Sequence, residues 1–512
     1  MGEDSLKKRY LFKLLANFVG FVFSIITQAI IPRSLGPKAY GDFGLLSSFF
    51  SQFVGFLDMG TSICFYTKLS GKQKDFVLVR FYAGYMVIIS IITLAFVSIA
   101  HVCGLYRVIW PDQRLPYVYL AALWGILYWI LGILTMMGDA YGLTVSMEKA
   151  RISQRALGLI LILLLFIFMQ IQLTQFFVYH YVIVLFLAGV LIYLFERKGY
   201  SLNKIWVFPS RTQINKYFKE FYLFSHPLFW VTAFALLSGI FDRWILQIAG
   251  GSFQQGFYSL SYQIGAMCFL FTGAMTPLLL REFSIAHANN DRSQMAVLLR
   301  RYFPTLFSIS AFFSCFIALQ ADKVIYIFGG NQYRGARVAV MIMAFYPIHQ
   351  TYGQLTASLF YATGQTVLYR NIGMIFLILG LPLTYFLIAP ADKLGLNAGA
   401  TGLAIKMVLI NVICVNVQLY FHAKQLNLRF GRYIAHQVLS ITCLLLFAAF
   451  ATFGVDYVLA LRTKLLINFL VAGLGYSIMV IGIAYFLPAV FGISRDDINL
   501  LRAKLKSLLE YA

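Results

Sequence analysis

The sequence predicts an all-α polytopic membrane protein with about fourteen transmembrane helices, and three observations predict this fold class. Apolar residues make up 60% of the 512 positions and charged residues only 12%, whereas soluble domains have about half and about a quarter. The mean hydropathy is +0.78. Finally, no polar stretch is long enough to form a soluble domain, so nearly the whole chain is expected to lie in lipid.

Apolar runs of about 20 residues, the length that an α-helix needs to cross a bilayer, recur along the chain. Dividing the sequence on this length predicts fourteen crossings, near 14–33, 42–66, 82–104, 117–138, 156–172, 176–195, 221–248, 256–280, 302–320, 338–362, 372–390, 397–421, 433–453 and 465–487. An even number of crossings places both termini on the same side of the membrane.

The distribution of basic residues predicts which side that is. Lys and Arg number 29 in the termini and even-numbered loops but 10 in the odd-numbered loops. Cytoplasmic loops carry this excess, so both termini are expected in the cytoplasm. The net charge of +22 is spread over short loops, which suits anionic lipid and argues against nucleic acid as a partner. The charged N-terminus lacks a cleavage site and is interpreted as leading into a retained first helix.

A weak internal repeat is present at an offset of 215 residues. The shift maps the first predicted helix onto the seventh and aligns five pairs of identical residues: Ile30/Ile245, Gly36/Gly251, Gly41/Gly256, Phe56/Phe271 and Thr61/Thr276. Six helices per repeat would make the two halves parallel. We therefore expect two six-helix lobes around a central cavity, followed by two extra C-terminal helices.

The corresponding domain boundaries are an N-lobe at 1–195, a linker at 196–220, a C-lobe at 221–421, and helices thirteen and fourteen with a tail at 422–512. The linker has Ser210 and Gln213 in capping-box spacing, followed by apolar residues at helical spacing. The tail has a similar pattern after Ser494 and Asp497. Both segments predict amphipathic helices whose basic faces rest on anionic lipid at the cytoplasmic surface.

Sequence motifs of enzymes are missing. The chain has no phosphate-binding loop, zinc-binding helix signature, nucleophile elbow or dinucleotide fingerprint. Outer loops of about a dozen residues also leave little room for catalytic side chains. We expect a protein that is not an enzyme and that needs no cofactor or metal, apart from a possible coupling ion, H⁺ or Na⁺.

Ionisable residues inside predicted crossings are candidates for a site, because each costs about 2.5–3.5 kcal/mol on insertion into a membrane. Asp242 and Arg243 lie in the seventh predicted helix, Lys406 in the twelfth and Asp58 in the second. They could form a substrate or ion site. Alternatively, Asp242 pairs with Arg243 or Lys406 as a structural tie between helices.

Other basic residues near the ends of crossings could bind an anionic headgroup. Arg33, in the sequence IIPRSLGPKAYG, either extends to lipid headgroups or points inward as a bidentate donor for a diphosphate. Lys68, Arg80 and Arg281 could contact an incoming anion on the cytoplasmic side, although most loop cations only set topology. His349 in helix ten suits proton coupling or an interhelical hydrogen bond.

Three segments carry a resemblance to a known family. IIPRSLGPKAYGDFGLLSSFF followed by FLDMGTSICFY is similar to the first two helices of the Wzx-type polysaccharide flippases, members of the multidrug/oligosaccharidyl-lipid/polysaccharide (MOP) exporter superfamily. SHPLFWVTAFALLSGIFDRWILQIAGGSFQQGFYSLSYQIGAM resembles the seventh and eighth helices, including Asp242, Arg243 and the start at Gly256. LFYATGQTVLYRNIGM is similar to the turn between helices ten and eleven.

The resemblance implies a bacterial inner-membrane protein that flips an undecaprenyl-diphosphate-linked oligosaccharide, such as an O-antigen repeat unit, in lipopolysaccharide or other surface polysaccharide biosynthesis. Other polysaccharide-assembly proteins are possible partners. Some relatives couple transport to an ion gradient in antiport, and Asp58, Asp242 and His349 are the candidates here. Arg33, Lys68, Arg80, Arg243, Arg281 and Lys406 are the candidates for substrate binding.

Three alternatives stay open. A cation-coupled drug exporter of the same superfamily would need an acidic cavity, against which Arg243 and Lys406 argue. A membrane-embedded glycan polymerase or transferase would need a long outer loop. A scaffold of a glycan-assembly complex would tolerate substitution of every intramembrane charge.

Overall fold

The computed structural model describes residues 6–72, 75–200, 210–226, 229–269, 275–459, 465–493, 495, 498 and 499. In these residues the regular secondary structure is helical throughout, without strands, which confirms the all-α class. The chain divides into two compact units, Met1–Gly256 and Phe257–Ala512. The predicted tail helix lies largely outside the described residues.

Eleven described helices are long and apolar enough to cross a membrane. Two of them, α1 (Leu6–Asp58) and α9 (Phe229–Met267), are each two consecutive helices, joined at a glycine with non-helical backbone. The predicted tenth crossing is divided between α14 (Arg337–Met343) and α15 (Tyr346–Ala362). The chain is a multi-pass membrane protein. Counting α1 and α9 as two crossings each, and α14 with α15 as one further crossing, gives the fourteen predicted crossings.

The two joining glycines are equivalent positions of the predicted repeat. Gly36 has φ 73° and ψ 167°, and Gly251 has φ 64° and ψ −170°. A positive φ with extended ψ is essentially restricted to glycine. The same rare conformation therefore ends the first helix of each repeat, which supports the offset of 215 residues.

A second pair of repeat glycines makes reciprocal close contacts. A Cβ atom on Gly41 would lie 1.9 Å from the carbonyl oxygen of Ser252, and a Cβ atom on Gly256 would lie 2.0 Å from that of Pro37. Pro37 and Ser252 are themselves separated by the repeat offset. Both glycines thus allow backbones to approach more closely than any side chain would permit.

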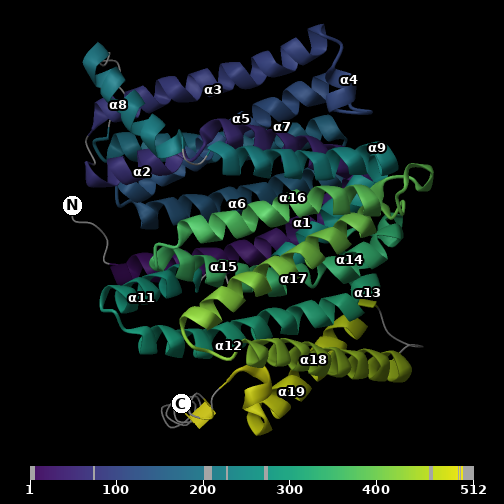
Figure 1. Ribbon diagram of the computed structural model, residues 1–512. Coiled ribbons are helices and arrows are strands. Elements are labelled where there is room, and N and C mark those ends of the chain that lie inside the picture. Colours follow the sequence, from purple (N-terminus) through teal and green to yellow (C-terminus); the bar gives the residue numbers. More distant parts are fainter. Residues whose placement is uncertain are drawn as a thin grey trace. The chain divides into compact units, whose positions relative to one another are not determined.

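Between α1 and α9, the described residues of the first unit form further helices (Figure 1). They are α2 (Thr61–Gly71), α3 (Phe76–Val102), α4 (Tyr106–Ile109), α5 (Leu115–Ala140), α6 (Thr144–Phe168), α7 (Leu173–Arg197) and α8 (Arg211–Ser225). Aromatic side chains fill part of its core, where Phe50 stacks on the fully buried Trp110 at 5.7 Å between ring centroids.

Helix α8 confirms the amphipathic helix that the sequence predicts. Ser210 Oγ accepts a hydrogen bond from the backbone N–H of Gln213, and Gln213 Oε1 accepts one from the N–H of Ser210, forming a capping box. The helix packs against α2 and α3 (Figure 1). Tyr217 donates a hydrogen bond to Asp75 Oδ2 at 2.9 Å, and burial together with Asp75 raises the pKa of Tyr217 to about 12.

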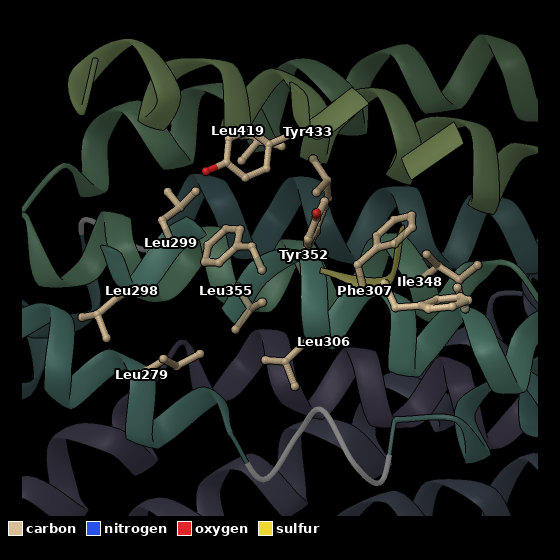
Figure 2. Close-up of a cluster of buried hydrophobic side chains, with 14 of the residues drawn as sticks. Leu279, Leu298, Leu299, Leu306, Phe307, Ile348, Tyr352, Leu355, Leu419 and Tyr433 are labelled. Carbon is tan, nitrogen blue, oxygen red and sulfur yellow. The ribbon is translucent and has the colours of Figure 1, made fainter. Parts of the chain in front are cut away.

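The second unit contains the remaining helices. They are α11 (Thr276–Ala288), α12 (Arg292–Leu319), α13 (Ala321–Phe328), η3 (Asn331–Ala336), α14, α15, α16 (Thr366–Ile388), η4 (Ala391–Lys393), α17 (Gly399–Gln425), α18 (Phe430–Leu459), α19 (Leu465–Phe486) and η5 (Pro488–Phe491). Figure 2 shows the centre of this unit, where Phe307 of α12 and Tyr352 of α15 pack with ring centroids 4.9 Å apart. Leucines of α12 and α17 pack into the same core.

One helix boundary differs from the prediction in a way that affects the site. Helix α6 begins at Thr144, whereas the sequence predicted a crossing from residue 156. The charged residues between these positions lower the local hydropathy, so a window that selects apolar residues starts too late. The structure places Glu148, Arg151 and Arg155 on a membrane-spanning helix and not in a loop.

Candidate functional site

A cavity of about 240 Å³ lies in the first unit between α5, α6 and α7. Its lining combines apolar and aromatic residues with two guanidinium groups and an amide: Tyr128, Leu131, Gly132 and Thr135 of α5, Arg151, Gln154 and Arg155 of α6, and Leu187 of α7. Arg151 is seven residues from the start of α6, a rise of about 10 Å along the helix. Both cations lie in the N-terminal half of α6, directly before its apolar run.

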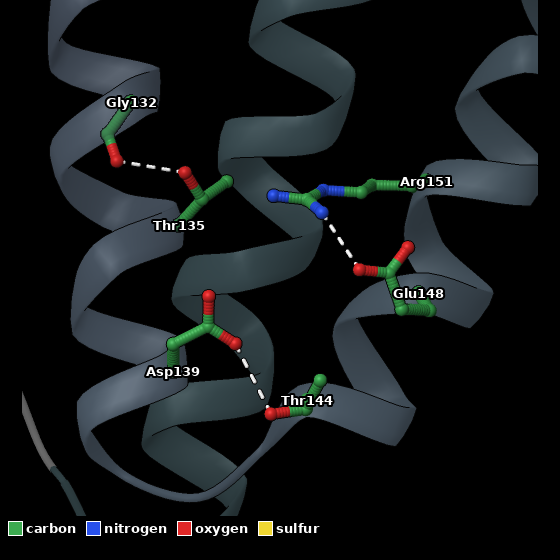
Figure 3. Close-up of polar contacts among 6 residues, drawn as sticks. All are labelled: Gly132, Thr135, Asp139, Thr144, Glu148 and Arg151. Atoms are coloured by element: carbon green, nitrogen blue, oxygen red, sulfur yellow. Dashed lines mark hydrogen bonds and ion pairs between the residues drawn. The ribbon is translucent and has the colours of Figure 1, made fainter. Parts of the chain in front are cut away.

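A buried carboxylate holds one of the two arginines. Glu148 is 3% exposed, and its Oε1 atom accepts a hydrogen bond from Arg151 Nη1 at 2.7 Å (Figure 3). Glu148 and Arg151 are three residues apart on α6 and therefore share a helix face. This pair uses one donor of a guanidinium that has five. In the described part of the chain, the other donors of Arg151 have no hydrogen-bond partner.

The turn from α5 to α6 fixes the orientation of this helix face. Thr144 Oγ1 donates to Asp139 Oδ1 at 3.1 Å, which closes the turn between the two helices (Figure 3). On α5, Thr135 Oγ1 donates to the carbonyl of Gly132, three residues earlier in the same helix, at 2.7 Å. Both hydroxyls are satisfied locally, so the arginines remain the principal donors at the cavity.

The second arginine packs closely against α1. A Cβ atom on Gly20 would lie 1.2 Å from Arg155 Nη1, so the guanidinium occupies the space that a side chain would need there. Gln154 Nε2 donates to the carbonyl of Ile183 at 3.2 Å and ties α6 to α7. Arg151 and Arg155 are four residues apart, which places both on one face of α6. The described lining of the cavity carries two guanidinium groups and no carboxylate, which suits an anion such as a diphosphate.

Asp58, a candidate from the sequence, lies at a helix boundary. Its carboxylate accepts hydrogen bonds from Thr61 Oγ1 at 2.9 Å, from Ser62 N at 3.1 Å, from Ser62 Oγ at 2.8 Å and from Tyr82 OH at 3.1 Å. Asp58 ends α1, so these contacts cap the start of α2 and join it to α3. This geometry accounts for the burial of the side chain at 7% exposed.

Asp242 and Arg243 lie in the first half of α9. Asp242 is 7% exposed. Arg243 Nη1 donates to Gln255 Oε1 at 3.0 Å, and Gln255 Nε2 donates to the carbonyl of Arg243. These contacts connect the two halves of α9 across the non-helical Gly251.

The other basic candidates of the first unit lie in different surroundings. Lys68 Nζ pairs with Glu220 Oε2 of α8 at 2.6 Å. Arg80 lines an apolar cavity of about 730 Å³ between α3 and α8. Arg33 is exposed on α1. The structure does not bring these three residues into one cluster with Arg151 and Arg155.

The candidates of the second unit are also separate from one another. Lys406 of α17 is 5% exposed and lies against Gly380 of α16, where an added Cβ atom would be 3.0 Å from Lys406 Cε. His349 Nε2 is 3.2 Å from Gln437 Oε1 of α18, an interhelical hydrogen bond. Arg281 is exposed and pairs with Glu282 at 2.6 Å.

Metal binding finds no support in these arrangements. Across the described ranges, no group of three or more His, Cys, Asp and Glu residues could hold a metal ion. The two guanidinium groups at the α6 cavity can recognise an anion.

Comparison with known proteins places this site in a known fold. Neither a protein-family model nor a curated protein matches the sequence. Among solved structures, the lipid II flippase MurJ in an inward closed conformation matches with a TM-score of 0.64 at 15% identity, over 93% of this chain and 99% of that chain. An inward-facing multidrug resistance MATE family transporter of the MOP superfamily matches with a TM-score of 0.63 at 14% identity, over 80% and 94%.

A third solved structure extends the comparison. A MOP superfamily transporter from Pyrococcus furiosus, described as having a binding pocket of reverse polarity, matches with a TM-score of 0.54 at 14% identity, over 83% and 96%. The chain therefore has the fold of MOP superfamily transporters, as the sequence resemblance predicted. This fold is common to flippases and drug exporters, so the choice between them depends on the site.

Proposed function

We propose that this chain is a flippase that moves an undecaprenyl-diphosphate-linked oligosaccharide from the cytoplasmic to the outer leaflet of the bacterial inner membrane by alternating access. The observation that carries the proposal is the α6 cavity, an open space between α5, α6 and α7. Arg151 and Arg155 line it from a helix that is long and apolar enough to cross a membrane. The fold shared with a lipid II flippase supports the same conclusion.

The chemistry of such a substrate matches the cavity. A diphosphate loses its hydration shell when it enters a hydrocarbon region, and guanidinium groups replace the lost hydrogen bonds with charge-assisted ones. The polyprenyl tail can stay in lipid while the diphosphate and sugar cross inside the protein. The pairing of Arg151 with Glu148 holds one guanidinium in a fixed orientation and so lowers the entropic cost of binding.

The drug-exporter alternative fits the site less well. A site for cationic drugs needs unpaired acidic groups. Glu148 is already paired with Arg151, and the described lining of the cavity has two positively charged guanidinium groups and no carboxylate. Repulsion by this charge disfavours a cationic ligand.

The candidate residues predicted from the sequence have two proposed roles. Some contact the substrate during transport, and others couple transport to an ion gradient. Arg33, Lys68, Arg80, Arg243, Arg281 and Lys406 are proposed contacts of the anionic headgroup during transport. Asp58, Asp242 and His349 are proposed to couple transport to a H⁺ or Na⁺ gradient. Because Lys68 and Arg281 each pair with a glutamate at a partly or fully exposed position, we expect only small effects from their substitution.

The test is a deletion strain complemented with variants. Arg155→Gln is preferred because it leaves the Glu148–Arg151 pair intact and avoids an unpaired buried carboxylate. We expect surface glycan to fall by more than about tenfold, because a charge-assisted hydrogen bond contributes about 1.5–3 kcal/mol. Lipid-linked oligosaccharide should accumulate on the inner leaflet, which separates a flippase from a polymerase or scaffold.

Arg370→Gln is the matched control, since Arg370 is an exposed cation that hydrogen-bonds only its neighbour Asn371 within the described chain. It should leave glycan and lipid-linked oligosaccharide unchanged. Normal surface glycan with Arg155→Gln, at a normal protein level, would remove the α6 cavity from the proposal.

A further inference from the structure

A second cationic pocket, of about 370 Å³, lies in the second unit where α12, the turn between α17 and α18, and η5 meet. Its polar lining consists of Arg300 of α12, Asn427 and Arg429 of the turn, and Arg432, Tyr433 and His436 of α18. The pocket is separate from the α6 cavity and contains none of the residues that the proposed function uses.

Hydrogen bonds connect α12, α18 and the η5 segment next to this pocket. Ser308 Oγ of α12 and Ser440 Oγ of α18 are 2.9 Å apart, and Ser440 Oγ donates to the carbonyl of Val490 in η5 at 2.7 Å. Thr305 Oγ1 donates to the carbonyl of Gly492 at 2.7 Å. Gly492 has φ 68°, and a Cβ atom there would lie 2.4 Å from Pro304 Cβ. The backbone around Gly492 and Pro304 is thus closely packed, while Arg300, Arg429 and Arg432 are exposed.

Within the described residues, no carboxylate balances the charge of this pocket. Three arginines line it, and its described lining contains no Asp or Glu. In the described part of the chain, Arg300, Arg429 and Arg432 have no ion pair, and none of their guanidinium groups makes a hydrogen bond. Helix α18 also has no acidic residue in its first turn. Arg429 and Arg432 therefore add positive charge where the helix dipole is already positive, which is unfavourable without an anion.

Buried polar atoms of the lining also lack partners. Tyr433 is 6% exposed, and its hydroxyl has no hydrogen-bond partner among the described residues. The same holds for both ring nitrogens of His436. A buried polar atom without a partner is costly, so a ligand that supplies acceptor oxygens would stabilise this arrangement.

We propose that this pocket binds a phosphate group, held by the guanidinium groups of Arg300, Arg429 and Arg432 and by the Tyr433 hydroxyl. Arginine suits phosphate because its planar donors match the oxygens in pairs. The phosphate belongs either to the headgroup of an anionic phospholipid or to a soluble phosphate ion. The site is independent of the flippase proposal, since its occupancy can be measured without any transport substrate.

The experiment measures thermal unfolding of the purified full-length protein in neutral detergent. The probes are phosphatidylglycerol, phosphatidylcholine, and inorganic phosphate at constant ionic strength. We expect phosphatidylglycerol to raise the unfolding temperature more than phosphatidylcholine does. The variant Arg429→Gln/Arg432→Gln should need at least about tenfold more probe for half of the shift. Tyr433→Phe, which keeps every charge, should need a few-fold more.

The control variant Arg334→Gln/Arg370→Gln removes two exposed cations of the same unit from outside the pocket. It should respond as the wild type does. A shift with phosphatidylglycerol alone identifies the lipid as the source, and an equal shift with inorganic phosphate identifies the soluble ion. The proposal is overturned if neither phosphatidylglycerol nor inorganic phosphate raises the unfolding temperature of the wild type. It is also overturned if the pocket and control variants lose this shift equally.

Discussion

Two groups of charged residues in the first unit, each with one buried carboxylate, differ in how their hydrogen bonds are used. The carboxylate of Asp58 accepts four hydrogen bonds from Thr61, Ser62 and Tyr82, all within the protein. Arg151 instead uses one donor on Glu148, and it lines a cavity together with Arg155. Burial of a charge therefore does not by itself leave hydrogen-bonding capacity for an anionic ligand. Arg151 keeps such capacity beside an open space.

The first prediction concerns the transport rate. Arg155→Gln should lower the transport rate by more than about tenfold while the unfolding temperature in detergent stays near that of the wild type, because the Glu148–Arg151 pair is kept. Surface glycan and thermal unfolding of the same variant provide the two measurements. A fall in both would show that Arg155 stabilises the fold and would contradict a role in binding.

The second prediction concerns stability. Asp58→Ala should lower the free energy of unfolding by about 3 kcal/mol, because buried donors of three residues lose a charged acceptor. The matched control is Asp456→Ala, whose side chain is 41% exposed and pairs with Lys323 at 2.6 Å; its cost should stay below about 1 kcal/mol. Equal costs for both variants in a denaturation series would contradict the capping role of Asp58.

The third prediction concerns the free-energy contribution of one hydrogen bond at Asp58, and the expected effect is smaller. Tyr82→Phe removes one donor at 3.1 Å and keeps the ring that stacks on Phe65 at 4.3 Å. The expected cost is about 1 kcal/mol. Together with Asp58→Ala in a double-mutant cycle, the two changes should be non-additive, since they remove the same interaction. Strict additivity would show that Tyr82 stabilises the fold in another way.

The sequence predicts much of the fold because the relevant signals are local. Apolar runs predict the crossings, and Ser210 with Gln213 predicts the start of α8. Gly36 and Gly251 mark equivalent positions of the repeat, where the structure has the same non-helical backbone. The alternative role for His349, an interhelical hydrogen bond, agrees with its contact to Gln437.

The site was harder to predict for physical reasons. Charges of α6 lower its hydropathy, so the sequence placed Arg151 and Arg155 in a loop. Their spacing to Glu148, which puts all three on one helix face, is the signal that could have identified them. The arginine pocket of the second unit assembles from Arg300, Arg432 and Gly492, which are far apart in the chain. Only the packing of three elements brings them together.

The most direct test of the central claim is binding of undecaprenyl diphosphate to the purified protein. With Arg155→Gln, the dissociation constant should rise by about tenfold or more, while Arg370→Gln should bind as the wild type does. Equal affinity of the wild type and Arg155→Gln for this lipid would contradict the claim that the α6 cavity recognises the diphosphate.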